Sequence, residues 1–228
     1  MATRRSYEQA CTTARTLDIV GGRWTLLMIR ELMLGLRRFA DLLEGLPGIG
    51  RNLLSQRLKE LEAEGIISRR RLPAPAASWV YELTEDGRAL GPALSELGRW
   101  GAERLGPPSP DALFRPAWAM FPMSYLADAQ ATRGVRETYE FRIGEDVFHL
   151  RVRDGTVIPR NGPAEAPELV AAMDPETLRE LFFGGLDPMA AVAAGRIRIE
   201  ADPEVLARAV AILATNPGAP ASGSAPSP

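Results

Sequence analysis

The chain has 228 residues, enough for one large domain or two small ones with a core each. Its 27 basic and 29 acidic side chains give a formal charge of −2, so the whole molecule is not the strongly basic protein expected of a bulk nucleic-acid binder. A single cysteine and a single histidine exclude an internal disulfide, a cysteine-based zinc site and a histidine-rich metal site.

The charge is divided unevenly along the chain. Residues 1–104 contain 16 basic and 13 acidic side chains, whereas residues 105–228 contain 11 and 16. The basic character therefore lies in the first half, and we expect the two halves to have different functions. The sequence shows neither a signal peptide nor an apolar run of membrane-spanning length, so we expect a cytoplasmic protein with no membrane partner.

Proline-rich segments divide the chain. The segment GPPSPD at 106–111 cannot continue a helix, and it is predicted to link a domain at 1–105 to a domain at 112–214. Small, polar and proline residues over 215–228 predict a disordered tail.

The first half shows helical periodicity, interrupted once by a hairpin. Helices are predicted over residues 8–20, 24–34, 39–43 and 50–64. Strands at 66–72 and 79–83 are joined by PAPAAS, and a long helix then runs from Thr84 to about Arg104. Three helices followed by a two-stranded wing form the winged helix-turn-helix, in which the helix before the hairpin enters the DNA major groove.

The helix at 50–64 has two different faces. Its leucines, Leu54, Leu58 and Leu61, fall within about 60° of one another and must face the core. The opposite face carries short hydrogen-bonding side chains that suit base edges: Asn52, Ser55, Gln56 and Lys59. A helix face that is merely solvated would also be polar, and the neighbouring charges favour DNA over this alternative.

Basic side chains accompany this polar face. Arg51 lies in the first helical turn, where it can neutralise a phosphate, and Arg69, Arg70 and Arg71 follow in the first wing strand. We assign these four residues to the DNA backbone. Arg57 flanks the leucines instead, and we expect it to pair with an acidic side chain.

A single module of this kind makes few phosphate contacts and would bind DNA weakly at physiological salt. We therefore expect a homodimer that reads two major grooves one turn apart. The amphipathic helices at 8–20 and 88–104 lie outside the minimal winged unit, and their apolar faces are the predicted two-fold contact. The alternative is that both helices pack only on their own domain.

The second half is predicted to be an α+β domain. Alternating residues over 139–142 and 147–152 predict an antiparallel hairpin, followed by a helix from Pro175. A helix from Asp187-Pro188, a strand at 196–199 and a closing helix at 203–213 complete it. Its large apolar side chains exceed the needs of a core, so we assign seven to a pocket for a small apolar ligand: Trp118, Phe121, Phe141, Phe148, Phe182, Phe183 and Met189. Plain core packing without a ligand is the alternative.

Neither half shows the groups of an enzyme. His149 lies on a predicted strand with no Ser, Cys or acid at catalytic spacing, so we expect a structural histidine with its hydrogen bonds satisfied. No phosphate-binding glycine motif is present, and we expect neither catalysis nor a cofactor.

Several motifs of the first half occur together and in order. They are Cys11, Gly21-Gly22-Arg23-Trp24-Thr25, Arg38-Phe39, Leu46-Pro47-Gly48-Ile49, Leu54-Ser55-Gln56-Arg57-Leu58 and Tyr81-Glu82-Leu83-Thr84. With these motifs the chain resembles the HxlR family of bacterial winged-helix regulators, relatives of MarR. The resemblance implies a dimeric transcriptional regulator, often a repressor, with residues 50–64 as its recognition helix. The chain departs from the family pattern in two places. It has Gly50 where family members usually have Ser, and its wing tip contains no arginine.

The second half carries a resemblance of its own. The segment LFFGGLDPMAAVAAGRIRIEADPEVLARAVAIL resembles the end of sterol carrier protein-type domains, whose sheet and helices enclose an apolar tunnel for lipids. Together the two resemblances imply an α+β protein with an N-terminal winged helix-turn-helix domain and a C-terminal sterol carrier-like domain. A lipid-binding carrier with a vestigial winged domain is the alternative.

Cys11 has two interpretations. The HxlR resemblance implies a possible redox sensor, because some relatives detect oxidants through a cysteine near this position. Sensing requires an exposed thiolate, and Arg4, Arg5 and Arg15 could lower its pKa. The alternative is a small, buried and inert residue.

Overall fold

The computed structural model describes residues 6–105, 108–109, 111–125 and 127–213. The chain divides into two compact units, Met1–Leu94 and Ser95–Pro228, and each is described by itself. The tail predicted over 215–228 and three positions of the predicted linker lie outside the described residues. No helix in the described part of the chain is both long and apolar enough to cross a membrane.

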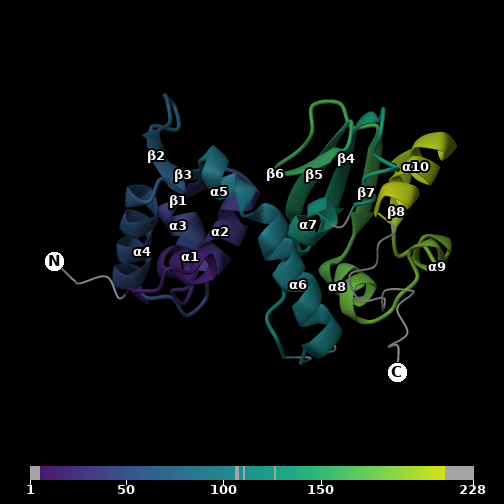
Figure 1. Cartoon of the computed structure of the whole chain (residues 1–228). Helices are drawn as coiled ribbons and strands as arrows, with labels where there is room; N and C mark the ends of the chain where they lie inside the picture. Colours follow the sequence, from purple (N-terminus) through teal and green to yellow (C-terminus); the bar gives the residue numbers. More distant parts are fainter. Residues whose placement is uncertain (1–5, 106–107, 110, 126, 214–228) are drawn as a thin grey trace, which may run out of the picture. The chain divides into compact units, whose positions relative to one another are not determined.

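Helices surround a small sheet in the N-terminal unit (Figure 1). In chain order its elements are α1 (Thr12–Val20), α2 (Thr25–Met33), β1 (Arg37–Arg38), α3 (Phe39–Gly45), α4 (Arg51–Ala63), β2 (Ile67–Arg71), β3 (Trp79–Leu83), α5 (Glu85–Ala89) and the start of α6 (Gly91–Leu105). The antiparallel sheet has the order β1-β3-β2, with Ile67 opposite Leu83 and Arg71 opposite Trp79. The predicted helix, turn, helix and wing are therefore confirmed. Strand β1 was not predicted, because its two residues, both arginine, show no strand pattern.

The core of this unit lies where the apolar faces of the helices meet the sheet. Its most buried members are Met28, Ile29, Leu32, Leu42, Leu54, Leu58, Leu61, Ile67 and Val80. Trp24 does not belong to the α2 face as its spacing indicated, because it is the N-cap residue and has a left-handed backbone with φ 79°. Gly65 has φ +72°, which explains why α4 ends where the sequence placed its end.

The long helix predicted from Thr84 to Arg104 is two helices. Thr84 begins α5 by accepting a hydrogen bond from the Gly87 amide through its hydroxyl. A β-carbon on Gly87 would lie 2.1 Å from the Ile66 carbonyl oxygen, so α5 approaches the wing too closely for any other residue. The new helix α6 starts at Gly91, and Pro92 in its first turn needs no hydrogen-bond partner for a backbone amide.

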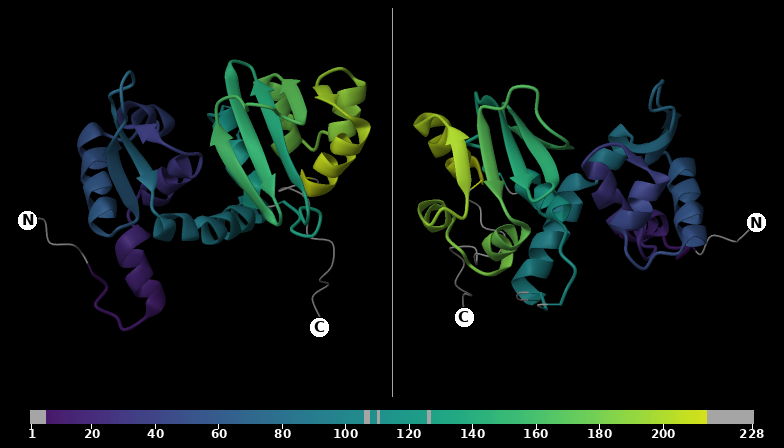
Figure 2. Two further views of the ribbon diagram at one scale, coloured as in Figure 1. Left: turned by 90° about the horizontal axis from the view of Figure 1, so that it is seen from above. Right: turned by 180° about the vertical axis from the view of Figure 1, so that it is seen from behind.

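The C-terminal unit is a five-stranded sheet with helices on one face (Figures 1 and 2). Its elements are α7 (Pro116–Tyr125), β4 (Arg136–Ile143), β5 (Asp146–Arg153), β6 (Thr156–Asn161), β7 (Leu169–Met173), α8 (Pro175–Phe183), α9 (Pro188–Ala193), β8 (Arg198–Ala201) and α10 (Pro203–Leu213). The strand order is β6-β5-β4-β7-β8, and only the β4–β7 pair is parallel.

The predicted hairpin and the helices from Pro175, Pro188 and Pro203 are confirmed. The strand predicted at 196–199 lies two residues further along. Three elements were missed. Both α7 and β6 contain a proline, Pro122 and Pro159, which weakened the pattern of each, and β7 is a short apolar segment that periodicity cannot assign.

The two faces of the sheet differ in polarity. On the apolar face, Phe141, Ala171 and Ile199 are neighbours on β4, β7 and β8. On the other face, Glu140 of β4 pairs in register with His149 of β5, and both are buried. The Nδ1 atom of His149 lies 2.9 Å from the Gly162 carbonyl oxygen, but its buried Nε2 atom has no hydrogen-bond partner among the described residues. The expectation of a fully satisfied histidine is therefore only half right.

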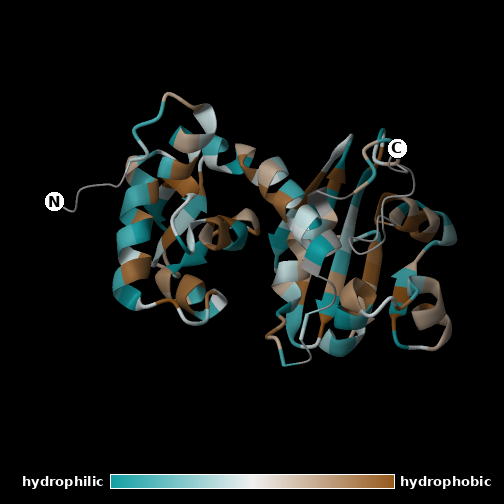
Figure 3. Cartoon of the chain, turned by 60° about the horizontal axis from the view of Figure 1, so that its bottom comes forward, coloured by the Kyte–Doolittle hydropathy of each residue, from teal (hydrophilic) through white to brown (hydrophobic). Residues whose placement is uncertain are grey.

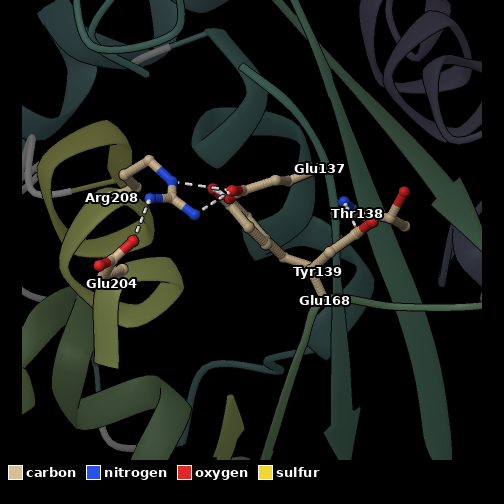
Figure 4. Close-up of polar contacts among 6 residues, drawn as sticks. All are labelled: Glu137, Thr138, Tyr139, Glu168, Glu204 and Arg208. Carbon is tan, nitrogen blue, oxygen red and sulfur yellow. Dashed lines mark hydrogen bonds and ion pairs between the residues drawn. The ribbon is translucent and has the colours of Figure 1, made fainter. Parts of the chain in front are cut away.

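A polar cluster fastens α10 to β4 on the helix-covered face (Figure 4). Glu137 accepts hydrogen bonds from the Tyr139 hydroxyl at 2.6 Å and from the Arg208 Nε at 2.8 Å. Tyr139 is fully buried, and burial together with the Glu137 carboxylate raises the pKa of its phenol. The arginine thus compensates a carboxylate that the sheet has removed from water.

Candidate DNA-binding surface and apolar cavity

The two faces of α4 differ in burial as the sequence indicated. Leu54, Leu58 and Leu61 are at most 2 % exposed. Arg51, Asn52, Gln56 and Lys59 are exposed on the rest of the helix, and Ser55 is half-buried. Figure 3 shows the ribbon of α4 mostly in the hydrophilic colour, with hydrophobic bands between. The structure therefore presents these five residues on one accessible helix without yet showing what they bind.

Gln56 is held in place by a chain of contacts that begins at the glycine pair. The Arg57 guanidinium passes so close to Gly22 that a β-carbon there would lie 2.8 Å from its central carbon. Arg57 forms an ion pair with Glu60 at 2.6 Å, which confirms that it pairs with an acid. The other carboxylate oxygen of Glu60 accepts a hydrogen bond from the Gln56 Nε2 at 2.8 Å. The sequence motifs contain Gly22, Gln56 and Arg57 but not Glu60, and only the fold connects the four residues.

The first turn of α4 has no side-chain cap. Gly50 is the N-cap residue, with φ −77° and ψ 146°, and it supplies no side-chain hydrogen bond to the first turn. Its carbonyl oxygen accepts the first helical hydrogen bond from the Leu54 amide at 3.0 Å. The amide groups of the first turn and the positive end of the helix dipole are therefore left for an anion from outside.

The three wing arginines, which the sequence treated alike, have different environments. The Arg69 guanidinium lies 4.4 Å from the Trp79 ring centroid and 5.8 Å from that of Tyr81, so it is pre-ordered by aromatic faces. Arg70 forms an ion pair with Glu82 at 2.8 Å. Arg71 makes only a long 3.4 Å hydrogen bond to the Ala77 carbonyl oxygen. The charges of Arg69 and Arg71 are thus the more available ones.

Apolar side chains are exposed on the two helices that were expected to form a dimer. Leu17 of α1 is 42 % exposed, and Leu97 and Trp100 of α6 are 54 % and 57 % exposed. The Arg104 guanidinium lies 4.8 Å from the Trp100 ring centroid. Large apolar groups left in water on neighbouring helical turns are typical of a surface that another chain covers.

Cys11 is exposed, which rules out the interpretation of a buried, inert residue. It is the N-cap residue of α1 and makes no side-chain hydrogen bond to the first turn, but the nearby backbone amides of Ala14 and Thr13 lower the pKa of its thiol. Arg4 and Arg5, which were expected near it, lie outside the described residues.

A cavity of about 500 Å³ lies between the apolar face of the C-terminal sheet and helices α8, α9 and α10. The residues that line it are Met123, Phe141, Leu169, Ala171, Met173, Leu178, Leu181, Phe182, Gly185, Leu186, Asp187, Pro188, Met189, Val192, Ile197, Ile199, Leu206, Ala209, Val210 and Leu213. Of the seven side chains assigned to a pocket, the structure brings Phe141, Phe182 and Met189 to this cavity.

The other four assigned side chains do not line it. Phe121 and Phe148 are buried in the core, and Trp118 is a half-buried residue of α7. Phe183 is exposed and meets Phe114 edge-on, with ring centroids 6.0 Å apart. The residues of β7 and α10, which supply seven of the 20 lining residues, were missed because the prediction used only the largest apolar side chains, aromatic residues and methionine.

Comparison with known proteins connects both units to families. Residues 19–108 match the HxlR-like helix-turn-helix model, and residues 123–214 match the SCP-2 sterol transfer family. The HTH-type transcriptional regulator YvaP of Bacillus subtilis is 38 % identical over 93 residues, which are 41 % of this chain and 86 % of YvaP. The chain belongs to the HxlR-like helix-turn-helix family. It is thus a transcriptional regulator of the HxlR type with an SCP2-like domain, as both resemblances implied.

Other HxlR-type regulators show the same partial coverage. YodB of Bacillus subtilis is 38 % identical over 90 residues, which are 40 % of this chain and 80 % of YodB. The solved reduced form of YodB has 35 % identity and a TM-score of 0.38, and the match covers 42 % of this chain and 95 % of that one. The regulator Rv3095 of Mycobacterium tuberculosis is 43 % identical over 101 residues, which are 42 % of this chain and 63 % of Rv3095. These matches cover about two fifths of the chain.

Proposed function

We propose that this HxlR-type regulator binds operator DNA as a homodimer and represses transcription, and that a small apolar ligand in its C-terminal cavity modulates the binding. The observation that carries the DNA part is the surface of α4, whose hydrogen-bonding side chains are exposed beside an uncapped helix start.

Base reading is assigned to Asn52, Ser55, Gln56 and Lys59. Gln56 donates one Nε2 hydrogen to Glu60 and keeps a second hydrogen and its Oε1 atom free. A glutamine amide with one donor and one acceptor available matches the N7 and N6 atoms of adenine in the major groove. Because Arg57 neutralises Glu60, the anchor brings little repulsion toward DNA. Glu60 and Arg57 are therefore positioning residues for Gln56.

Backbone binding is assigned to the start of α4 and to the wing. Arg51 and the bare first turn of α4 face one phosphate, and Arg69 and Arg71 face others. Arg70, which the sequence placed with them, has its charge compensated by Glu82 and adds less. Few phosphates per protomer mean that two protomers are needed. The exposed Leu97 and Trp100 of α6 supply apolar area for pairing, and the exposed Leu17 of α1 is a separate apolar position.

Regulation requires a ligand with different affinities for the DNA-competent and DNA-incompetent forms. The cavity has a volume within the range of small-molecule sites and a predominantly apolar lining. A lipid carrier with a vestigial winged domain would bind the same ligand but would show no coupling to DNA.

Selection of bound sequences from random duplex DNA tests the proposal. The purified wild-type protein is expected to enrich a two-fold symmetric site, and the Asn52→Ala/Gln56→Ala double variant is expected to lose that enrichment while it keeps the cavity. Equal enrichment by both proteins, or none by either, would contradict the assignment of α4 and favour the carrier.

Redox control through Cys11 is a second candidate, because its exposed thiol has a lowered pKa. In that case treatment with the thiol oxidant diamide changes operator affinity in the wild type but not in Cys11→Ser. An unchanged affinity after complete modification of Cys11 excludes this form of control.

A further inference from the structure

The described helices of the C-terminal unit cover one face of its sheet, and the opposite face is rich in arginine (Figure 2). Residues that pair in register, or that lie two apart on one strand, share a face of a sheet. The face of Glu140 and His149 therefore also carries six exposed arginines from four strands: Arg136, Arg142, Arg151, Arg153, Arg160 and Arg198. We call it the arginine face. It holds six of the 11 basic residues in a half of the chain that has 16 acidic ones.

Three of these arginines crowd one end of the sheet. Arg136 of β4 stands directly opposite Arg153 of β5, and Arg151 is two residues away on the same strand. Like charges directly opposite each other on neighbouring strands destabilise a sheet. No described residue forms an ion pair with any of the three, and Arg153 donates only to the carbonyl oxygens of Glu137 at 3.1 Å and Val152 at 2.7 Å. An anion bound at this end would relieve their repulsion.

The acidic residues of the same face do not neutralise this end. Glu140 is buried and forms an ion pair with Arg142 at 2.7 Å. Glu168 accepts a hydrogen bond from the Thr138 amide at 2.6 Å. Glu200 lies on β8, the edge strand furthest from β5. The positive charge is therefore concentrated where β4 begins and β5 ends.

The other side chains of the face indicate what kind of anion it fits. No described residue of the face is Phe, Tyr or Trp, and its one exposed large apolar side chain is Ile158, at 36 %. A membrane-binding surface inserts aromatic and aliphatic side chains, and a surface for single-stranded nucleic acid stacks bases on aromatic rings. Guanidinium groups bind phosphates through paired hydrogen bonds, and a DNA duplex carries one negative charge per about 1.7 Å of its axis. The composition of the face thus favours a duplex backbone.

We propose that the arginine face binds the phosphate backbone of duplex DNA and gives this regulator a second, sequence-independent DNA contact. Both units belong to one chain, so binding of α4 to an operator raises the local concentration of DNA phosphates for the C-terminal unit. The face contributes affinity and salt dependence, whereas α4 contributes the choice of sequence. This inference rests on the proposed DNA-binding function and extends it to the second unit.

A triple variant of the full-length protein, Arg136→Gln/Arg151→Gln/Arg153→Gln, tests the contact. Its affinities for the selected operator and for a scrambled duplex are measured by fluorescence anisotropy between about 0.05 and 0.2 M salt. Both affinities should fall at least about tenfold at about 0.1 M salt, and their ratio should stay unchanged. The slope of log affinity against log salt should be shallower by about 3 to 5, because each phosphate contact contributes about 0.9 and a dimer loses up to about six. Removal of the opposed charges should not lower the melting temperature.

Two matched controls separate charge from position. The variant Arg136→Lys/Arg151→Lys/Arg153→Lys keeps the three charges and should retain most of the salt dependence. Arg151→Gln and Arg179→Gln each remove one arginine, but Arg179 lies on α8, outside the arginine face. Only Arg151→Gln should weaken binding to the scrambled duplex.

The outcomes distinguish this inference from the proposed function. If the wild type binds neither duplex at low salt, both fail. If it binds the operator and the glutamine triple variant shows the same affinities and slope, the second contact is wrong and the assignment of α4 stands. Equal losses in the lysine and glutamine triple variants, or in Arg151→Gln and Arg179→Gln, would also overturn it. Vesicles of phosphatidylglycerol and phosphatidylcholine provide a last comparison, and a glutamine triple variant that loses vesicle binding but keeps DNA binding would assign the face to a membrane instead.

Discussion

The two units of this regulator use their apolar residues in opposite ways. In the N-terminal unit Leu54, Leu58 and Leu61 of α4 are buried, and the surface that we assign to function is the polar remainder of the helix. In the C-terminal unit the apolar residues of β4, β7, α8 and α10 enclose open space, and the interior itself is the candidate site. The candidate site of one unit is therefore the polar helix face that does not pack into the core, and the candidate site of the other is a cavity inside its core.

The starts of the helices show a second contrast. Gly50 supplies no side chain to the first turn of α4, whereas Asp174 and Asp187 cap α8 and α9 with carboxylates. Two helices of the C-terminal unit thus have side-chain caps, whereas α4 begins without one, as α1 and α2 also do. Only the uncapped start of α4 adjoins the exposed polar side chains that we propose to bind DNA, so it is the helix start at which a phosphate is expected.

The largest expected effect is a loss of operator binding that leaves ligand binding in the cavity unchanged. Asn52→Ala/Gln56→Ala should weaken operator binding by about 1 to 3 kcal/mol for each lost bidentate contact in each protomer. Fluorescence anisotropy with the selected operator measures the loss. Binding of a fluorescent apolar probe in the cavity should stay unchanged. Glu62→Asp, which keeps the charge at an exposed position of the same helix, is the control and should bind as the wild type does.

Disruption of the exposed apolar surface on α6 should have the next largest effect. Trp100→Glu places a charge where we expect a dimer contact, and loss of a buried interface tryptophan costs about 2 kcal/mol or more. The dimer dissociation constant should rise at least about thirtyfold, as measured by sedimentation equilibrium. Arg99→Ala on the same helix should change it little. A monomeric wild type at micromolar concentration would contradict the dimer.

A smaller effect tests the anchor of Gln56. Glu60→Ala removes one hydrogen bond, and we expect the operator to lose about 0.5 to 1.5 kcal/mol relative to nonspecific DNA. Simple removal of a negative charge would instead strengthen binding to both DNAs and leave their ratio unchanged. The ratio of the two dissociation constants therefore decides whether Glu60 positions the glutamine.

The smallest expected effect concerns acid pH and the C-terminal unit. The Thr177 backbone amide lowers the pKa of Asp174, so this cap stabilises the fold above pH about 4 and is lost as the pH falls below that value. Protection of the Thr177 amide against hydrogen exchange should decrease over that range. Asp174→Asn keeps a capping oxygen without titrating, and its protection should depend less on pH.

The winged domain was predictable because its signals are local. The leucines of α4 repeat with the helical period, Gly65 ends the helix, and the wing strands are rich in β-branched and aromatic residues. The division of the helix after Leu90 was missed, because the apolar spacing continues across Gly91. The helical period alone cannot reveal such a break.

The cavity was only partly predictable because it is assembled from distant segments. Phe141 and Ala171 are neighbours through the parallel pairing of β4 with β7, a register that no local pattern encodes. The environments of the wing arginines depended likewise on cross-strand neighbours, Trp79 and Tyr81 for Arg69 and Glu82 for Arg70. The sequence shows which types of side chain are present, but the pairing of the strands determines which of them are neighbours.

If α4 reads operator DNA as proposed, Gly22 influences the choice of operator although it does not lie on α4. Any larger side chain there would push the Arg57 guanidinium aside, and Arg57 holds the glutamate that orients Gln56. A screen for regulators with altered operator preference should therefore recover substitutions at this hidden glycine as well as on the exposed helix. Empty space beside one arginine is part of how this protein distinguishes DNA sequences, if α4 reads them as proposed.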